Sequence, residues 1–370
     1  MAPPPPPLMD DLVGEILLRL PPEEPANLFR ATLVCKPWFR ILSDPAFRRR
    51  YRLFHRTPPM LGIFQNLRHD NTIPRFVPTA ATVSPCSPPS LDCWFWWALD
   101  CRHGRVLIYS IGPTNLFVWD PITGDQQHLP VPAYAYAYCT AAVLCTAARC
   151  DHLDCRGNPF LVVFVGTGDR DGVTWASSFL SETGAWSTPT TVDLSASTTV
   201  DVDSFIDTRP SILNGDALYF TLERGKSILK YDLGERDLSV IDAPVCEQTG
   251  IIMTAEDGGL GFAGTEGNSL HLWSWLAGDD SVVGWVLCRV IKLETLLPIH
   301  NPYVPPQAIG FAEGTDTIFL DTDVAVFTLE LKSGKTRVWE TGGYYSFDFV
   351  VIPFMSFCTP DLAMGRLLLP

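Results

Sequence analysis

The feature of this sequence that most limits its fold is a pattern of short strands that recurs from about residue 95 onward. Each unit contains two apolar runs, then a turn, then a shorter closing run. Corresponding points of successive units lie roughly 40–65 residues apart, at Asp120, Trp186, Asp232, Ser274 and Glu330. Four short strands at this period are typical of the blades of a β-propeller, whereas the period is too long for a β-sandwich.

The repeat predicts an all-β domain over residues 95–370, closed as a propeller of about six blades. Five units are clear, and the segment 65–100 together with a strand at 346–352 is expected to supply another. We expect the ring to close by pairing of early and late strands. Residues 57–94 are expected to form a linker that contains the possible first strands.

A different periodicity fills residues 8–56 and predicts a small helical module. The apolar residues of its first helix fall on one face and are Leu12, Val13, Ile16, Leu17 and Leu20. Prolines break the segment, so three further short helices are expected at 25–35, 38–42 and 46–55. Such short helices bury little surface, which is typical of a module that docks on a partner. The proline run before them, in residues 1–7, predicts a disordered leader.

Charge and hydropathy limit the partners of this chain. The net charge is −14, and residues 1–56 hold nine Lys+Arg against six Asp+Glu, while the remainder holds 18 against 35. The residues after 56 carry a net negative charge and would repel the phosphate backbone of a nucleic acid, so we expect no nucleic-acid partner. No apolar run approaches the roughly 20 residues of a membrane helix, and no secretory signal is present. We expect a protein of the cytoplasm, the nucleus or both, with no membrane partner and with reduced thiols among its 11 cysteines.

Two patterns point toward cofactors, and simpler explanations are favoured for both. Cys145, Cys150, His152 and Cys155 lie close together, but their C-x4-C-x-H-x2-C spacing lacks the paired C-x2-C of common zinc sites. The segment 259–264 matches the glycine fingerprint of dinucleotide sites, but a strand rather than a helix is expected to follow it. The sequence therefore predicts no metal, no cofactor and no catalytic residue.

The N-terminal residues include the segments Leu8-Met9-Asp10-Asp11-Leu12, Glu15-Ile16-Leu17, Arg19-Leu20-Pro21, Leu33-Val34-Cys35-Lys36 and Trp38. In order and spacing, these segments resemble the F-box motif along its whole length. The segments that follow, 43–49 and 54–59, resemble the large F-box families of plants. Met9 stands where proline is usual and Pro37 where a non-proline is usual, but neither interrupts the apolar face. The C-terminal region is similar in layout to F-box-associated propellers.

This resemblance implies an adaptor. An F-box docks on Skp1, which a cullin scaffold carries together with a RING subunit, and the C-terminal domain holds the target protein. Matching positions place the Skp1 contact at Leu8, Ile16, Leu17, Leu20, Pro21, Val34, Cys35 and Trp38. Leu12 and Leu28 are expected to serve the module's own core instead.

We therefore expect the substrate-recognition subunit of a Skp1–cullin–F-box E3 ubiquitin ligase, which is not itself an enzyme. Its catalytic contribution would be proximity, because a tethered target meets the charged conjugating enzyme at high effective concentration. Two alternatives stay open. One is a Skp1-bound interaction protein outside a cullin ligase, and the other, less favoured, is an enzyme built on the propeller.

Overall fold

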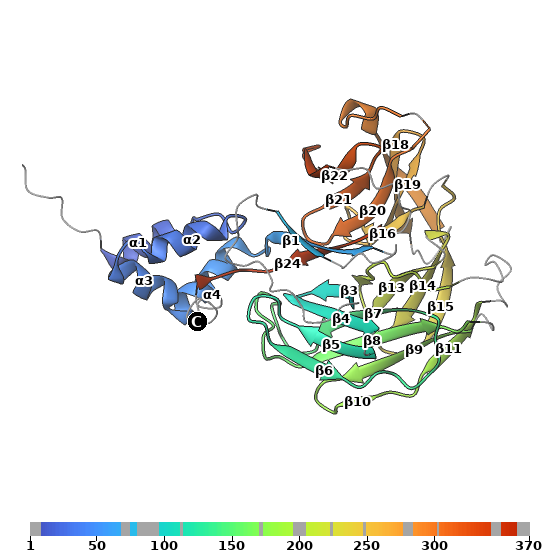
Figure 1. Ribbon diagram of the computed structural model, residues 1–370, viewed down its shortest axis with the longest axis horizontal. Helices are drawn as coiled ribbons and strands as arrows, with labels where there is room; N and C mark the ends of the chain where they lie inside the picture. The colour runs from blue at the N-terminus through green and yellow to red at the C-terminus, as the bar shows by residue number, and fades with distance from the viewer. Residues whose placement is uncertain are drawn as a thin grey trace, which may run out of the picture.

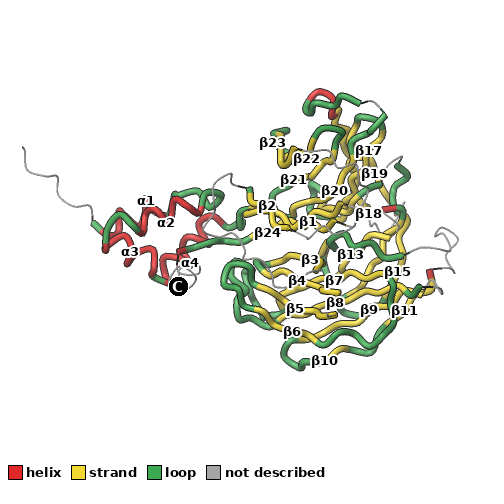
Figure 2. The backbone as a smooth tube through the Cα atoms, in the orientation of Figure 1, coloured by secondary structure: helices red, strands yellow, loops and turns green. Residues whose placement is uncertain are grey.

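The computed structural model has a helical module at one end and an all-β domain at the other (Figure 1). Coloured by secondary structure, the longer helices gather at one end of the molecule and the strands fill the rest (Figure 2). The structure describes residues 9–67, 75–79, 96–111, 114–169, 173–194, 205–222, 225–246, 249–276, 284–301, 303–341 and 349–360. No helix within these ranges is long and apolar enough to cross a membrane.

Four short helices build the described part of the module, as the sequence predicts. They are α1 (Asp10–Leu17), α2 (Pro25–Thr32), α3 (Lys36–Ser43) and α4 (Pro45–His55). Proline stands in the first turn of α2, α3 and α4, where a helix needs no backbone N–H. The carboxylate of Asp44 accepts a hydrogen bond from the backbone N–H of Ala46 at 2.9 Å and so caps α4. Local signals therefore explain where these helices begin.

Within the described residues, the strands form six antiparallel sheets, and these are the six blades of a propeller. The first blade contains β1 (Met60–Leu67), β2 (Arg75–Pro78) and β24 (Phe349–Met355). The second contains β3 (Trp96–Arg102), β4 (Arg105–Ile111), β5 (Thr114–Trp119) and β6 (Gln126–Leu129). The third contains β7 (Tyr138–Cys145), β8 (Phe160–Thr167), β9 (Val173–Leu180), β10 (Ala185–Trp186) and β11 (Thr190–Asp193).

The remaining three blades follow the chain in order. The fourth contains β12 (Ile212–Asn214), β13 (Ala217–Leu222), β14 (Ser227–Asp232) and β15 (Leu238–Asp242). The fifth contains β16 (Ile251–Thr254), β17 (Leu260–Glu266), β18 (Ser269–Leu276) and β19 (Gly284–Lys292). The sixth contains β20 (Gln307–Ala312), β21 (Thr317–Asp321), β22 (Ala325–Glu330) and β23 (Thr336–Thr341). The six-bladed propeller predicted from the repeat is thus confirmed.

Strands from opposite ends of the chain close the ring. β1 pairs with β24 in antiparallel register, with Ile63 opposite Pro353 and Gln65 opposite Val351. The two strands lie side by side next to the helical module (Figure 1). This pairing is the closure that the sequence predicts, and it places β1 and β2, within the 57–94 segment, in the propeller.

The turns between third and fourth strands explain the sequence repeat. In the second blade, Oδ1 of Asp120 accepts hydrogen bonds from the backbone N–H groups of Ile122 at 2.8 Å and Thr123 at 3.2 Å. In the fourth blade, Oδ1 of Asp232 accepts in the same way from Gly234 at 3.0 Å. A side-chain oxygen satisfies backbone N–H groups that the turn leaves without strand partners. At Asp120 and Asp232, the corresponding points of two blades are therefore the same kind of turn.

The helical module lies on one face of the propeller. Residues of the turns after β3, β7 and β20 line one cavity together with Arg56 and Thr57, which follow α4. We call this face the module face. Because the first strand of a blade crosses the propeller, the segments that precede β7 and β20 lie on the opposite face, which we call the far face.

Candidate functional site

The helix α1 divides its apolar residues between the module's core and its surface. Val13 and Leu17, one turn apart, are 5% and 1% exposed. Leu12 and Ile16, also one turn apart, are 46% and 52% exposed. Residues four apart lie above one another on a helix, so these two pairs form two adjacent stripes, one buried and one open.

The connection between α2 and α3 presents further apolar side chains to solvent. Leu33 is 84% exposed and Val34 is 61% exposed, and Cys35 is exposed beside them. Trp38, in the first turn of α3, is half-buried against the module's core. Exposure of these apolar side chains to water is unfavourable, and their burial against a partner would be favourable.

The structure sorts the residues expected at the Skp1 contact into three groups. Exposed residues are Ile16, Pro21, Val34 and Cys35, and half-buried residues are Leu20 and Trp38. Leu8 lies outside the described residues. Leu17 differs from the expectation, because it packs in the module's core and offers no surface to a partner. Leu28 lies in the core as expected, but Leu12 was wrongly assigned there and is exposed.

The module's core is completed by two residues of the β domain. Phe357 follows β24, leaves the propeller and is 2% exposed within the cluster that contains Leu17 and Leu28. Its ring meets Tyr51 of α4 edge-on, with the ring centroids 6.3 Å apart. Leu153, from the loop between β7 and β8, packs against the same cluster. The module is therefore anchored to the propeller through its own core.

A chain of charges runs from α4 to the second blade. Arg52 of α4 forms an ion pair with Asp154 in the β7–β8 loop. Asp154 also pairs with Arg156 at 3.1 Å, and Arg156 pairs with Asp120 at 2.7 Å. Burial lowers the pKa of Arg52, and the charge of Asp154 opposes that shift. Because Arg52 is only 9% exposed, this junction is more than a surface ion pair.

Comparison with known families agrees with this division of the chain. A sequence profile described as "F-box domain" matches residues 8–50. A second, described as "F-box protein AT5G49610-like, beta-propeller", matches residues 97–361, which is more than half of the chain. The chain belongs to this family of F-box proteins. The helical module is its F-box, and proteins of this family are typically non-catalytic adaptors.

Individual relatives are distant. The F-box protein At5g03970 of Arabidopsis thaliana is 23% identical over 381 residues, covering 93% of this chain and 87% of the relative. A protein of unknown function from Desulfotomaculum acetoxidans is 12% identical, with a TM-score of 0.40 over 80% of this chain and 83% of that chain. The propeller of Myceliophteria thermophila Cps50 (Swd1) is 12% identical, with a TM-score of 0.36 over 65% and 71%.

A cavity of about 240 Å³ opens at the module face between the F-box and the blades. Arg102 of β3 donates to Oγ of Ser211 at 3.1 Å and lies 3.4 Å from the carboxylate of Glu313, besides its ion pair with Asp100. One guanidinium thus ties together the second blade, the segment before β12 and the turn after β20.

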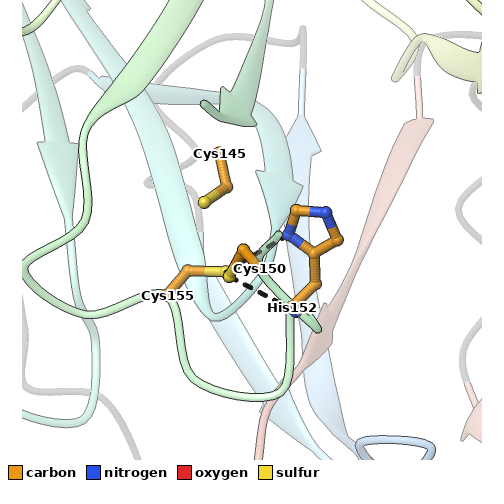
Figure 3. A group of neighbouring side chains, drawn as sticks. All are labelled: Cys145, Cys150, His152 and Cys155. Carbon is orange, nitrogen blue, oxygen red and sulfur yellow. Dashed lines mark hydrogen bonds between the residues drawn. The ribbon is translucent and has the colours of Figure 1, made fainter. Parts of the chain in front are cut away.

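Three cysteines and a histidine converge at the β7–β8 loop. Cys145 ends β7, and Cys150, His152 and Cys155 lie in the loop that follows (Figure 3). Their ligand atoms all lie within 4.8 Å of one another. These are the four residues that lie close together in the sequence, although their spacing did not favour a common zinc site. Of the described cysteines, eight are free thiols and Cys358 is disulfide-bonded, so the expectation of reduced thiols is wrong at Cys358.

Proposed function

We propose that this F-box protein is the substrate-recognition subunit of a Skp1–cullin–F-box E3 ubiquitin ligase. The observation that carries the proposal is an F-box with a filled core that still exposes Leu12, Ile16, Leu33 and Val34. The chain itself catalyses nothing in this proposal and acts by holding a target near the charged conjugating enzyme. We also propose that it works in the cytoplasm or nucleus of a plant cell, because the relative that spans most of the chain is a plant protein.

The proposed Skp1 contact follows the exposed stripe of α1 and the α2–α3 connection. It keeps Ile16, Leu20, Pro21, Val34, Cys35 and Trp38 from the expected set and adds Leu12 and Leu33. Leu17 supports this surface from beneath. Burial of exposed apolar area contributes about 25 cal/mol per Å², so four such side chains supply a substantial share of the affinity.

The proposed target-binding surface is the far face of the propeller. Two tyrosines stand exposed on the segments that precede β7 and β20, with Tyr134 at 50% and Tyr303 at 90%. Exposed tyrosines are common anchors in protein interfaces. With the F-box on the module face, a target on the far face would leave the adaptor contact unobstructed.

The experiment that tests the proposal measures Skp1 binding by calorimetry with the full chain. The double variant Ile16→Asp, Val34→Asp places two charges in the contact, and affinity should fall by at least about a hundredfold, since an unpaired buried charge costs several kcal/mol. Both residues are more than half exposed, so the fold should survive. The matched control is Val286→Asp, Leu287→Asp on β19, where 42% and 47% exposed residues lie far along the chain from the F-box.

Three outcomes decide the matter. Loss of binding in the F-box variant but not in the control supports the proposed contact. A folded wild-type chain without affinity for Skp1 refutes it. If Skp1 binds but cullin and the RING subunit do not join the complex, the protein acts outside a cullin ligase.

A further inference from the structure

The group formed by Cys145, Cys150, His152 and Cys155 has the composition of a structural metal site. Three sulfurs and one ring nitrogen come from a single loop and the strand end before it (Figure 3). Cys155 is buried and Cys145 and Cys150 are half-buried, whereas His152 lies at the surface. A Cys3His set is a common ligand set for structural zinc, which prefers four ligands in tetrahedral geometry.

Two of the separations within the group match the edges of a tetrahedral zinc site, and all four ligand atoms lie within 4.8 Å of one another. Sγ of Cys150 lies 3.7 Å from Sγ of Cys155, and Sγ of Cys155 lies 3.5 Å from Nδ1 of His152. With Zn–S of about 2.3 Å and Zn–N of about 2.0–2.1 Å, tetrahedral edges measure about 3.8 Å between two sulfurs and about 3.5 Å between sulfur and nitrogen. A disulfide would bring the sulfurs to about 2.0 Å, so the Cys150–Cys155 pair is not one.

We propose that Cys145, Cys150, His152 and Cys155 bind one zinc ion, which holds the β7–β8 loop against the F-box.

The surroundings of the sulfurs suit thiolates. Sγ of Cys150 accepts two N–H groups, from the backbone of His152 at 3.4 Å and from Nδ2 of Asn158 at 3.4 Å. A neutral thiol is a weak acceptor, and N–H groups directed at sulfur are the outer contacts that orient metal-bound cysteines.

A buried cation stands beside the group. Arg105 of β4 is 8% exposed and donates to the carbonyl oxygens of Cys155 and Asn158, the latter at 2.6 Å. Zinc with three thiolates carries a net charge of −1, which is costly to bury without compensation. The guanidinium of Arg105 supplies that compensation and fixes the backbone on both sides of Arg156. Arg105 thus compensates the negative charge of the site and also fixes the backbone conformation of the loop.

The β7–β8 loop contacts the F-box, so an ion bound in this loop would stabilise that contact. Leu153 and Asp154 lie between the ligands His152 and Cys155, and these two residues contact the F-box core and Arg52. Within 146–159 no helix or strand holds the chain, and His152 has a left-handed backbone with φ of 57°. An ion ligated on both sides of Leu153–Asp154 would lock this contact. It would therefore set the orientation of the F-box relative to the far face.

The first test measures metal in the full chain, purified under reducing conditions from zinc-supplemented cultures. About one zinc per chain is expected, and cobalt exchanged for it should give the visible bands of a tetrahedral thiolate site. Cys150→Ser and His152→Ala should lower zinc affinity by at least about tenfold, whereas His152→Cys restores a four-ligand set and should retain the ion. Cys288→Ser is the matched control, because Cys288 is a free, exposed cysteine outside the group.

The second test follows hydrogen exchange in α4. Removal of zinc by a chelator should increase exchange in α4 and in the β7–β8 loop and leave the fifth blade unchanged. This readout and the cobalt spectrum use the wild-type chain, so they stand even if the cysteine variants fold poorly.

Several results would overturn the proposal. They are a folded chain with well under one-tenth of a zinc and no cobalt spectrum, a Cys150–Cys155 disulfide under the same reducing conditions, or equal metal loss in Cys288→Ser. Unchanged exchange in α4 after zinc removal would overturn the proposed role in holding the F-box. None of these results depends on Skp1 binding, so they leave the proposed function to its own test.

Discussion

Removal of the Phe357 ring should separate the F-box from the propeller. Phe357 is 2% exposed and sits among Val13, Leu17, Leu28 and Tyr51 in the F-box core. Truncation of such a phenylalanine to alanine costs about 3–5 kcal/mol. A domain of this size rarely has more than about 3–5 kcal/mol of stability from its own core. The variant Phe357→Ala should therefore leave the F-box largely unfolded while the propeller stays closed.

Hydrogen exchange with peptide resolution can measure this loss helix by helix. Each 1.4 kcal/mol is a factor of ten in the opening equilibrium, so 3–5 kcal/mol predicts at least about a hundredfold faster exchange in α1 to α4. Exchange in β13 and β17 should not change. Phe357→Leu keeps most of the volume and should cost less than about 1.5 kcal/mol.

The control is a phenylalanine of equal burial elsewhere. Phe179 on β9 is 3% exposed and packs with Trp186, so Phe179→Ala should destabilise the propeller and spare the helices. If α1 to α4 keep their protection in Phe357→Ala, the F-box core is self-sufficient and the inferred anchoring is refuted.

Three further predictions concern single positions. Asp100→Ala removes the closer of the two carboxylates that pair with the buried guanidinium of Arg102 and should lower the free energy of unfolding in urea by about 3–5 kcal/mol. An effect below 1 kcal/mol, on the order of a surface pair, would mean that the pair is not buried in solution. Burial raises the pKa of Asp321 from 3.8 to about 6, so the folded state binds the extra proton and wild-type stability should fall as pH rises from about 4 to 6. Asp321→Asn should lack this loss in melting curves at several pH values, and identical curves would contradict the shift. Leu17→Ala should cost about 2–5 kcal/mol of F-box stability and Ile16→Ala under 1 kcal/mol, because only Leu17 is in the core; equal costs in denaturant titrations would contradict that assignment.

The sequence predicts the architecture well because both of its signals are local. The F-box helices follow from helical spacing and prolines, and the blades follow from turns such as those at Asp120 and Asp232. A turn whose side chain accepts from its own backbone N–H groups is formed by consecutive residues, so its pattern can be recognised in the sequence. Ring closure by β1 and β24 follows from the architecture, since a propeller needs it.

The placement of individual side chains depends on contacts that no local pattern records. Ile16 and Leu17 are neighbours on one broad apolar face, and their fates differ because Phe357, from the other end of the chain, fills the core beside Leu17. The cysteine group shows the same limit. Cys145 ends β7 opposite Phe160 of β8, so the hairpin returns Cys155 toward it across ten residues of sequence. Spacing rules built on consecutive ligands miss a site that a hairpin assembles.

The pairing of β1 with β24 also has a consequence for synthesis. The two strands leave the ribosome roughly 15–60 s apart at about 5–20 residues per second, so β1 waits that long with an unpaired edge. Phe357 emerges later still, and until then the F-box lacks part of its core. A chain halted before β24 would thus have neither a closed ring nor the Phe357 ring that completes the F-box core. Prematurely terminated chains would therefore lack the contact between the propeller and the F-box core.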